Sequence, residues 1–115
     1  MGQEGSELLR GTLDLLVLRT LEAGPRHGYG IARWIEQATG EAVRVEEGSL
    51  YPALYRMERK RWIRAEWGKS ELGRRARFYR ITAAGREHLA KETGVWARFN
   101  EAVRGVLVGD AAAKA

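Results

Sequence analysis

Two short segments with alternating apolar residues interrupt a chain that otherwise has helical periodicity. The first is WIRAEW, residues 62–67, and the second is RFYRIT, residues 77–82, in which Tyr79 and Ile81 lie on one side. The stretch between them, GKSELGRRA, is polar and contains two glycines. Alternation on both sides of such a loop predicts a β-hairpin with an exposed tip. The expected fold is therefore mainly α-helical with one small β-hairpin.

Apolar residues at helical spacing predict three helices before the hairpin and one after it. The first covers residues 6–22, and the second lies within HGYGIARWIEQATG and is closed by a glycine. The third covers residues 49–60, and the fourth, residues 83–108, follows Thr82 as its N-cap. The tetrapeptide AVRV, residues 42–45, is too short to assign and is compatible with a single strand.

A proline, Pro52, lies inside the third of these helices, in the run EEGSLYPALYRMERKRWI. The first N–H groups of a helix have no acceptor within it, so a residue without an N–H costs little there. With Ser49 as the N-cap, Pro52 is the third residue of the helix. The proline therefore predicts a helix start at Ser49. The core stripe of this helix would be Leu50, Ala53, Leu54 and Met57.

Positive charge is concentrated in residues 56–80, which contain ten Lys or Arg and three Glu. This block carries +7, whereas the whole chain carries +5, so the rest of the chain is slightly acidic. Clustered positive charge predicts a polyanionic partner. An ordinary solvated helix face is the alternative, but exposed tyrosines beside arginines favour nucleic acid. The polar face of the third helix consists of Ser49, Tyr51, Pro52, Tyr55, Arg56, Arg59 and Lys60.

Three helices followed by a basic hairpin are the layout of a winged helix-turn-helix. In that layout the third helix enters the major groove, and the hairpin lies along the DNA backbone or minor groove. Arg56 is the predicted base-reading residue, through a bidentate contact to guanine. The predicted phosphate contacts are Tyr29, Tyr51, Lys69, Arg74, Arg75 and Arg77.

Two apolar stripes predict contact with a second chain. A surface helix of a monomer needs one apolar stripe, but the first helix has two. The last helix has a heptad-like seam. The predicted dimer interface consists of Leu8, Leu15, Leu18, Leu89, Trp96, Phe99, Val103 and Val106. Trp96 and Phe99 have a second interpretation, as the walls of a pocket for a flat aromatic effector.

The stretches HGYGI and GSLYPAL, followed by GRR and an FYRIT-type strand, resemble the PadR family of bacterial transcriptional regulators. The resemblance runs from about Leu8 to Leu89. It implies a DNA-binding, usually repressing protein that forms homodimers through its first and last helices. Many relatives have a glycine at the end of the third helix, where this chain has Arg61. The residues placed at the DNA by this resemblance are Tyr29, Ser49, Tyr51, Pro52, Tyr55 and Arg56, with Arg74 and Arg75 in the wing.

Other classes of protein have little support in the sequence. The chain has no cysteine and only two histidines, in different segments, so no metal site and no cofactor are expected. No nucleophile is paired with a base, so an enzyme is not expected. The N-terminal apolar run has no basic lead-in and contains Asp14 and Arg19, unlike a signal peptide or a membrane span. A cytoplasmic protein is expected.

The expected organisation is a winged helix-turn-helix over residues 1–82, a dimerisation helix over 83–108 and a frayed tail over 109–115. The expected function is that of a homodimeric repressor that binds a near-palindromic operator in double-stranded DNA and is relieved by a small aromatic effector. The alternative is a basic winged-helix interaction module, a scaffold or nonspecific nucleic-acid binder, without an operator of its own. Sequence preference in DNA binding distinguishes the two.

Overall fold

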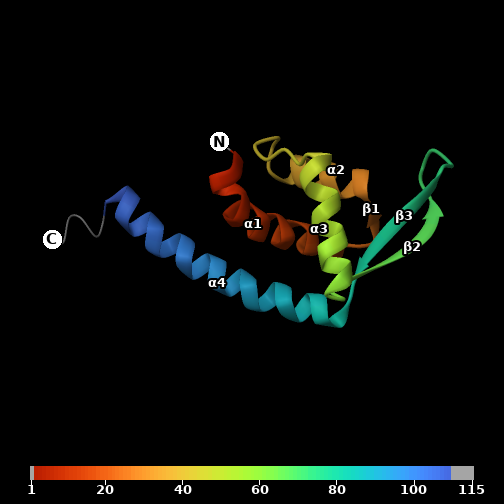
Figure 1. The fold of residues 1–115 in the computed structure, drawn as a ribbon. Coiled ribbons are helices and arrows are strands. Elements are labelled where there is room, and N and C mark those ends of the chain that lie inside the picture. Colours follow the sequence, from red (N-terminus) through yellow and green to blue (C-terminus); the bar gives the residue numbers. More distant parts are fainter. Residues whose placement is uncertain (1, 110–115) are drawn as a thin grey trace.

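The fold consists of four helices and a small sheet, in a computed structural model that describes residues 2–109, with side chains from residue 11 onward. The elements are α1 (Gly2–Glu22), β1 (Arg26–His27), α2 (Gly28–Ala38), α3 (Glu47–Arg59), β2 (Ile63–Lys69), β3 (Arg75–Ile81) and α4 (Ala83–Val108). Helices α1 to α3 form one unit, the β2–β3 hairpin projects from it, and α4 leaves it in the other direction (Figure 1). The prediction of a mainly α-helical winged helix-turn-helix with a long last helix is confirmed.

The sheet has three antiparallel strands in the order β1-β3-β2. In the hairpin, Ile63 pairs with Ile81 at the base and Lys69 with Arg75 near the tip, which confirms the predicted hairpin. Strand β1 was not predicted, because two residues are too few to show alternation. The tetrapeptide AVRV forms no strand. It lies between α2 and α3, and the edge of β3 is occupied by β1 instead.

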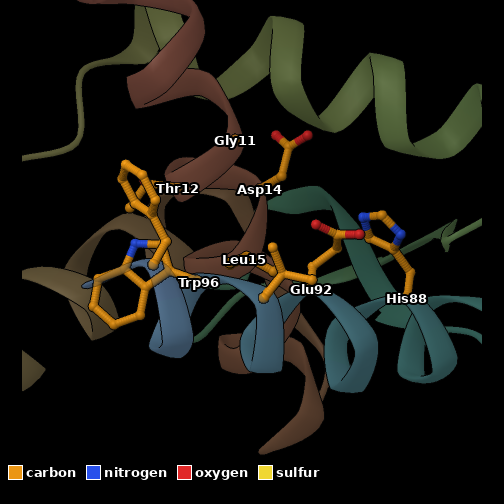
Figure 2. A pocket seen from close by; sticks show the side chains of 9 residues that line it. Gly11, Thr12, Asp14, Leu15, His88, Glu92 and Trp96 are labelled. Atoms are coloured by element: carbon orange, nitrogen blue, oxygen red, sulfur yellow. The ribbon is translucent and has the colours of Figure 1, made fainter. Parts of the chain in front are cut away.

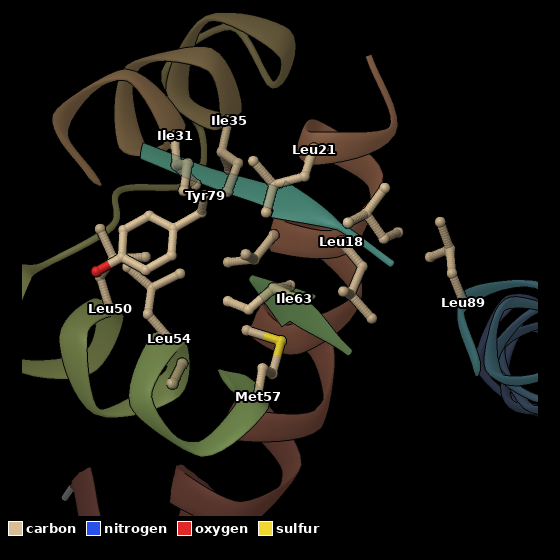
Figure 3. Packing of buried hydrophobic residues seen from close by; sticks show 13 residues of the cluster. Leu18, Leu21, Ile31, Ile35, Leu50, Leu54, Met57, Ile63, Tyr79 and Leu89 are labelled. Atoms are coloured by element: carbon tan, nitrogen blue, oxygen red, sulfur yellow. The ribbon is translucent and has the colours of Figure 1, made fainter. Parts of the chain in front are cut away.

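The core forms where the apolar faces of α1, α2 and α3 meet the base of the hairpin (Figure 3). The predicted stripe of α3 is buried as expected, and so are Tyr79 and Ile81 from β3. Burial of this much apolar side chain is the main favourable term in the folding of the domain. The buried hydrophobic residues are Val17, Leu18, Leu21, Ile31, Ile35, Leu50, Ala53, Leu54, Met57, Ile63, Tyr79, Ile81 and Leu89.

Two residues assigned to the dimer interface lie in this core. Leu18 is fully buried within its own protomer, and Leu89 is almost so. Helix α4 folds back against α1 in the same chain, so part of the second stripe of α1 is covered without a partner. The assignment of Leu18 and Leu89 to a dimer interface was therefore wrong. The side chain of Leu8 and the tail residues 110–115 lie outside the described residues.

The start of α3 differs from the prediction. The N-cap is Glu46, whose carbonyl accepts hydrogen bonds from the N–H groups of Ser49 (3.0 Å) and Leu50 (2.9 Å). Ser49 is therefore inside the helix, and Pro52 lies in its second turn. Pro52 has no N–H to donate to the carbonyl of Gly48, but Gly48 is exposed, so solvent rather than the helix is available to that carbonyl. The prediction of a helix start at Ser49 was wrong, because it assumed that Pro52 lies in the first turn of the helix.

Helix α3 ends at Arg59, and Arg61, two residues later, has the left-handed conformation at φ 65°. The N–H of Trp62 donates to the carbonyl of Met57 (3.0 Å), and the N–H of Arg61 donates to that of Glu58 (3.0 Å). This is the Schellman pattern, in which glycine is the usual residue at the left-handed position. The helix end is thus regular in geometry, although an arginine stands where glycine is favoured.

We expect Arg61→Gly to raise the free energy of unfolding by about 0.5–1 kcal/mol. The left-handed conformation costs a non-glycine residue roughly 1–2 kcal/mol, and the greater freedom of glycine in the unfolded chain offsets part of the gain. Urea unfolding followed by circular dichroism measures the change. Lys60→Gly is the matched control, because Lys60 has φ −82° and gains nothing from glycine. Stabilisation by both substitutions, or by neither, would contradict this account.

The end of α3, the base of the hairpin and the start of α4 meet at the carbonyl of Trp62. This carbonyl accepts from the N–H and the hydroxyl of Thr82, each at 3.0 Å. The Thr82 Oγ1 in turn accepts from the N–H of Gly85 (3.0 Å), which confirms Thr82 as the N-cap of α4. A Cβ at Gly85 would collide with the Trp62 carbonyl. We call Trp62, Thr82 and Gly85 the α3–α4 joint.

Candidate nucleic-acid interface

The outward face of α3 is built from residues that its core stripe leaves unburied. Tyr51, Pro52, Tyr55 and Arg59 are exposed, and Tyr55 retains 65% of its accessible surface. The Arg59 guanidinium lies over the Tyr55 ring, 5.8 Å from its centroid. An aromatic body beside a guanidinium contacts sugars, thymine methyl groups and phosphates. This face has the composition that the sequence predicted for a DNA-reading helix.

Arg56 does not belong to the outward face. Its Nη2 donates to Asp14 Oδ1 of α1 at 2.7 Å, and the two side chains are only 28% and 13% exposed. Burial raises the pKa of Asp14 above its ordinary value, against the opposing effect of the Arg56 guanidinium. The guanidinium predicted to contact guanine is thus bound to α1. Within α3 the exposed arginine is Arg59, whereas Arg56 is partly buried.

The β2–β3 hairpin, which is the wing of this fold, continues the outward face of α3. Lys69, Arg74 and Arg75 are exposed near its tip. Arg77 lies closer to the helix, and its Nη2 donates to Glu58 Oε2 of α3 at 2.8 Å. This ion pair fixes the wing against α3. It also occupies one of the guanidinium groups that the sequence assigned to phosphate.

A groove of about 480 Å³ separates the wing from the start of α2 and the side of α3. Its lining includes the aromatic residues Tyr29, Tyr51 and Trp67 and the cations Arg74 and Arg75. Segments far apart in the chain are therefore brought together by the fold, as the sequence predicted for the tyrosines and arginines. Trp67 was missed as a site residue. The alternation of β2 put it on the same side as buried Ile63, and that pattern does not show where the core ends.

The HGYG stretch shapes one wall of this groove. His27 is the N-cap of α2, and its Nδ1 accepts from the N–H of Gly30 at 3.1 Å. Gly28 allows close approach of the Tyr51 phenol, since a Cβ there would overlap its hydroxyl. Tyr29 points outward and is exposed. The stretch thus caps α2 and leaves room for Tyr51, and both tyrosines line the groove.

A second groove, of about 280 Å³, lies between α1 and α4. Asp14, His88 and Glu92 gather at one end of it and Trp96 lies at the other (Figure 2). Trp96 and Phe99 line it and remain 46% and 62% exposed. The two interpretations of these aromatic residues, dimer core and effector pocket, both fit this position. Val103 is half-buried, and Val106, Leu107 and Val108 continue the apolar surface of α4 towards its end.

Two other features bear on the class of protein. Among the side chains that the structure describes, from residue 11 to 109, no group of three His, Asp or Glu residues is placed to hold a metal ion. In the same part of the chain, every helix is too short or too polar to cross a lipid bilayer.

Comparison with known proteins gives one consistent result. The sequence profile of the PadR-like family of transcriptional regulators matches residues 17–91. The uncharacterized protein X of Lysinibacillus sphaericus is 33% identical over 98 residues, which are 85% of this chain and 90% of that protein. A transcriptional regulator from Clostridium thermocellum has a similar structure, with a TM-score of 0.77 and 28% identity over 85% of this chain and 95% of that one.

A PadR-like transcriptional regulator from Bacillus cereus is similar to nearly the same extent. Its TM-score is 0.75 at 28% identity, over 90% of this chain and 98% of that one. The matched profile begins within α1 and ends within α4, so it contains α2, α3 and the wing that form the candidate interface. The chain therefore belongs to the PadR-like family of transcriptional regulators.

Proposed function

We propose that the chain is a homodimeric repressor that acts in the cytoplasm by binding a near-palindromic DNA operator. The observation that carries this proposal is the continuous aromatic and cationic surface from the outward face of α3 to the wing. Each protomer would place α3 in a major groove, with half-sites about 34–36 Å apart. Residues 1–82 would form the DNA-binding unit and 83–108 the dimerisation helix.

A titration of labelled DNA from upstream of the protein's own gene tests the operator. Fluorescence anisotropy is followed for this duplex and for a scrambled duplex, each across a series of salt concentrations. A preference of roughly a thousandfold at physiological salt supports a specific regulator. Equal and steeply salt-dependent binding to both duplexes would show that the chain binds this DNA without sequence preference, which favours the alternative of a nonspecific interaction module. A selection from genomic fragments then establishes whether any sequence is preferred.

Arg59 is the residue that we assign to base readout in place of Arg56. It is exposed on the outward face of α3, whereas Arg56 is bound to Asp14. We expect Arg59→Ala to lower the preference at one position of each half-site by roughly tenfold, since a bidentate arginine–guanine contact discriminates by about 1–3 kcal/mol. Binding to a panel of singly substituted operators measures this. A uniform loss across the panel would instead make Arg59 a phosphate contact.

The apolar surface of α4 supports the dimer. Trp96, Phe99 and Val106 are exposed on α4, and so are Val95, Leu107 and Val108. Exposed apolar surface along one helix favours a second copy. Leu15, Leu8 and Val103 are proposed to extend the same interface. A pocket for a small aromatic effector beside Trp96 and Phe99 is the regulatory part of the proposal. Saturable quenching of tryptophan fluorescence by planar aromatic compounds, lost in Trp96→Phe, tests it.

We expect Phe99→Glu to weaken the dimer by roughly tenfold or more. A carboxylate would replace an apolar ring, and a two-fold interface contains each substitution twice. Sedimentation velocity over a range of concentrations measures the shift to monomer. Ala97→Glu is the control, because Ala97 is exposed on the other side of α4 and the added charge is the same. Equal weakening by both would show that charge, and not the seam, controls association.

A further inference from the structure

Trp67 is a large aromatic side chain on the wing that the core does not explain. It retains 60% of its accessible surface and lines the groove between the wing, α2 and α3. Single exposed apolar residues are common, but a tryptophan on a narrow hairpin surrounded by arginines has a specific neighbour. The Arg75 guanidinium carbon lies 4.4 Å from the centre of the Trp67 ring. This is within the range of a cation–π contact.

The register of the hairpin explains why these two side chains meet. Residues of one face alternate along each strand, so Ile63, Trp67 and Lys69 share a face with Arg75 and Arg77. Trp67 pairs with Arg77 directly, and Arg75 is its diagonal neighbour towards the tip. The face is buried at the base of the hairpin, where Ile63 lies, and becomes aromatic and cationic further out. This face of the hairpin therefore leads from the core, at Ile63, to the groove, at Trp67.

The two arginines of this face are held in different ways. Arg77 lies over the Tyr79 ring, 5.9 Å from its centroid, but it also donates to the Glu58 carboxylate, which uses N–H donors of the guanidinium. Arg75 is held by a ring, which contacts the flat face of the guanidinium and leaves the N–H donors at its edge available. An arginine fixed in this way loses less conformational freedom when it binds an anion. Arg75 is thus both oriented and able to donate.

We propose that Trp67 is a positioning residue for DNA binding, which holds Arg75 against the phosphate backbone of the strand that passes between α3 and the wing. This inference rests on the proposed DNA-binding function. Phosphate fits the groove because Arg74 and Arg75 line it together with the tyrosines of α2 and α3. Glu71 also lines the groove, near the tip of the wing, and its negative charge disfavours phosphate there. The part of the groove that favours phosphate is therefore the part lined by the arginines.

The experiment measures how the affinity for DNA depends on salt. The probe is a labelled duplex of random sequence, because a phosphate contact does not depend on the operator. The proteins are the wild-type chain, Arg75→Ala, Trp67→Ala, the double variant and Trp67→Phe. Arg64→Ala is the control. Arg64 is exposed on the opposite face of the same strand, and its substitution removes one positive charge, as Arg75→Ala does. Circular dichroism checks that each variant is folded.

Loss of one phosphate contact reduces the slope of log affinity against log salt by about one. We expect this reduction in Arg75→Ala and in Trp67→Ala, no further reduction in the double variant, and little change in Trp67→Phe or Arg64→Ala. A Trp67→Ala variant with the wild-type slope would overturn the inference, even with weaker binding, because Trp67 would then not act through Arg75. Additive losses in the double variant would do the same. Failure of the wild-type chain to bind DNA would instead reject the proposed function.

Discussion

Replacing Gly85 with alanine is expected to lower the free energy of unfolding by about 3 kcal/mol or more. The added Cβ would overlap the Trp62 carbonyl, which is backbone and cannot rotate away, and would press on the Ile81 side chain. Relief requires α4 to move, which breaks the hydrogen bonds of the α3–α4 joint. Overpacking of a fixed site costs about 1–3 kcal/mol, and loss of the N-cap adds about 1. Urea unfolding of the purified variant measures the effect.

Gly48→Ala is the matched control for this prediction. Gly48 also lies in a helix, but a Cβ there would have no neighbour within 4 Å. Alanine is the better helix former, so this variant should be as stable as the wild type or more stable by up to about 1 kcal/mol. If both variants were stabilised, helix propensity and not the joint would explain the result, and a similar loss of stability in both would also contradict the account of the joint. Gly85→Ser should be destabilised as Gly85→Ala is, because any Cβ at this position meets the Trp62 carbonyl.

Replacing Arg56 with alanine is expected to lower the free energy of unfolding by about 2–3 kcal/mol at neutral pH. The substitution leaves the Asp14 carboxylate, which is 13% exposed, without its guanidinium partner. Removal of one member of a buried ion pair costs about 3–5 kcal/mol, and less where water reaches the pair. A double variant, Asp14→Asn with Arg56→Ala, removes the stranded charge and should recover part of the loss. Urea unfolding of Arg56→Ala, of Asp14→Asn alone and of the double variant completes a double-mutant cycle.

The same variant should respond to pH in a defined direction. The folded-state pKa of Asp14 is already raised above its ordinary value of 3.8 by burial, and loss of Arg56 removes an effect that lowers it. The folded chain then binds a proton more tightly than the unfolded chain does. Stability from this group is therefore greatest below pH 3.8 and falls as the pH rises through the raised folded value. The difference in stability between Arg56→Ala and the wild type should shrink in acid.

No such effect on stability is expected if Arg56 only reads DNA. In that case Arg56→Ala would leave unfolding unchanged at every pH and would weaken DNA binding alone. A steeper loss of stability in acid than in the wild type would also contradict the account of Asp14.

Structural features that depend on a short stretch of chain could be predicted from the sequence. Alternation and helical spacing predicted the hairpin and the α3 stripe, because burial on one face imposes its period on the sequence. Thr82 was identified as an N-cap from its own chemistry. The fold class followed from these local features and from the family resemblance.

Features that depend on packing between distant elements could not be read in this way. The helical wheel of α3 separates core from non-core positions, but it does not show that α1 lies against the flank that carries Arg56. Leu18 was assigned to a partner for the same reason, since the contact of α4 with α1 is made within one chain. The pair Asp14 and Arg56 are 42 positions apart, and no local pattern connects them.

The α3–α4 joint has a consequence for the length of DNA that the proposed dimer can span. Helix α4 has 26 residues and so extends about 39 Å from the joint. A change of about 10° at its base would displace its far end by about 7 Å, which is about two base-pair steps of duplex. Because Thr82 and Gly85 fix this angle to the end of α3, the distance between the two recognition helices is determined at the joint. Operator spacing in this branch of the family would then evolve through a few backbone contacts far from any base.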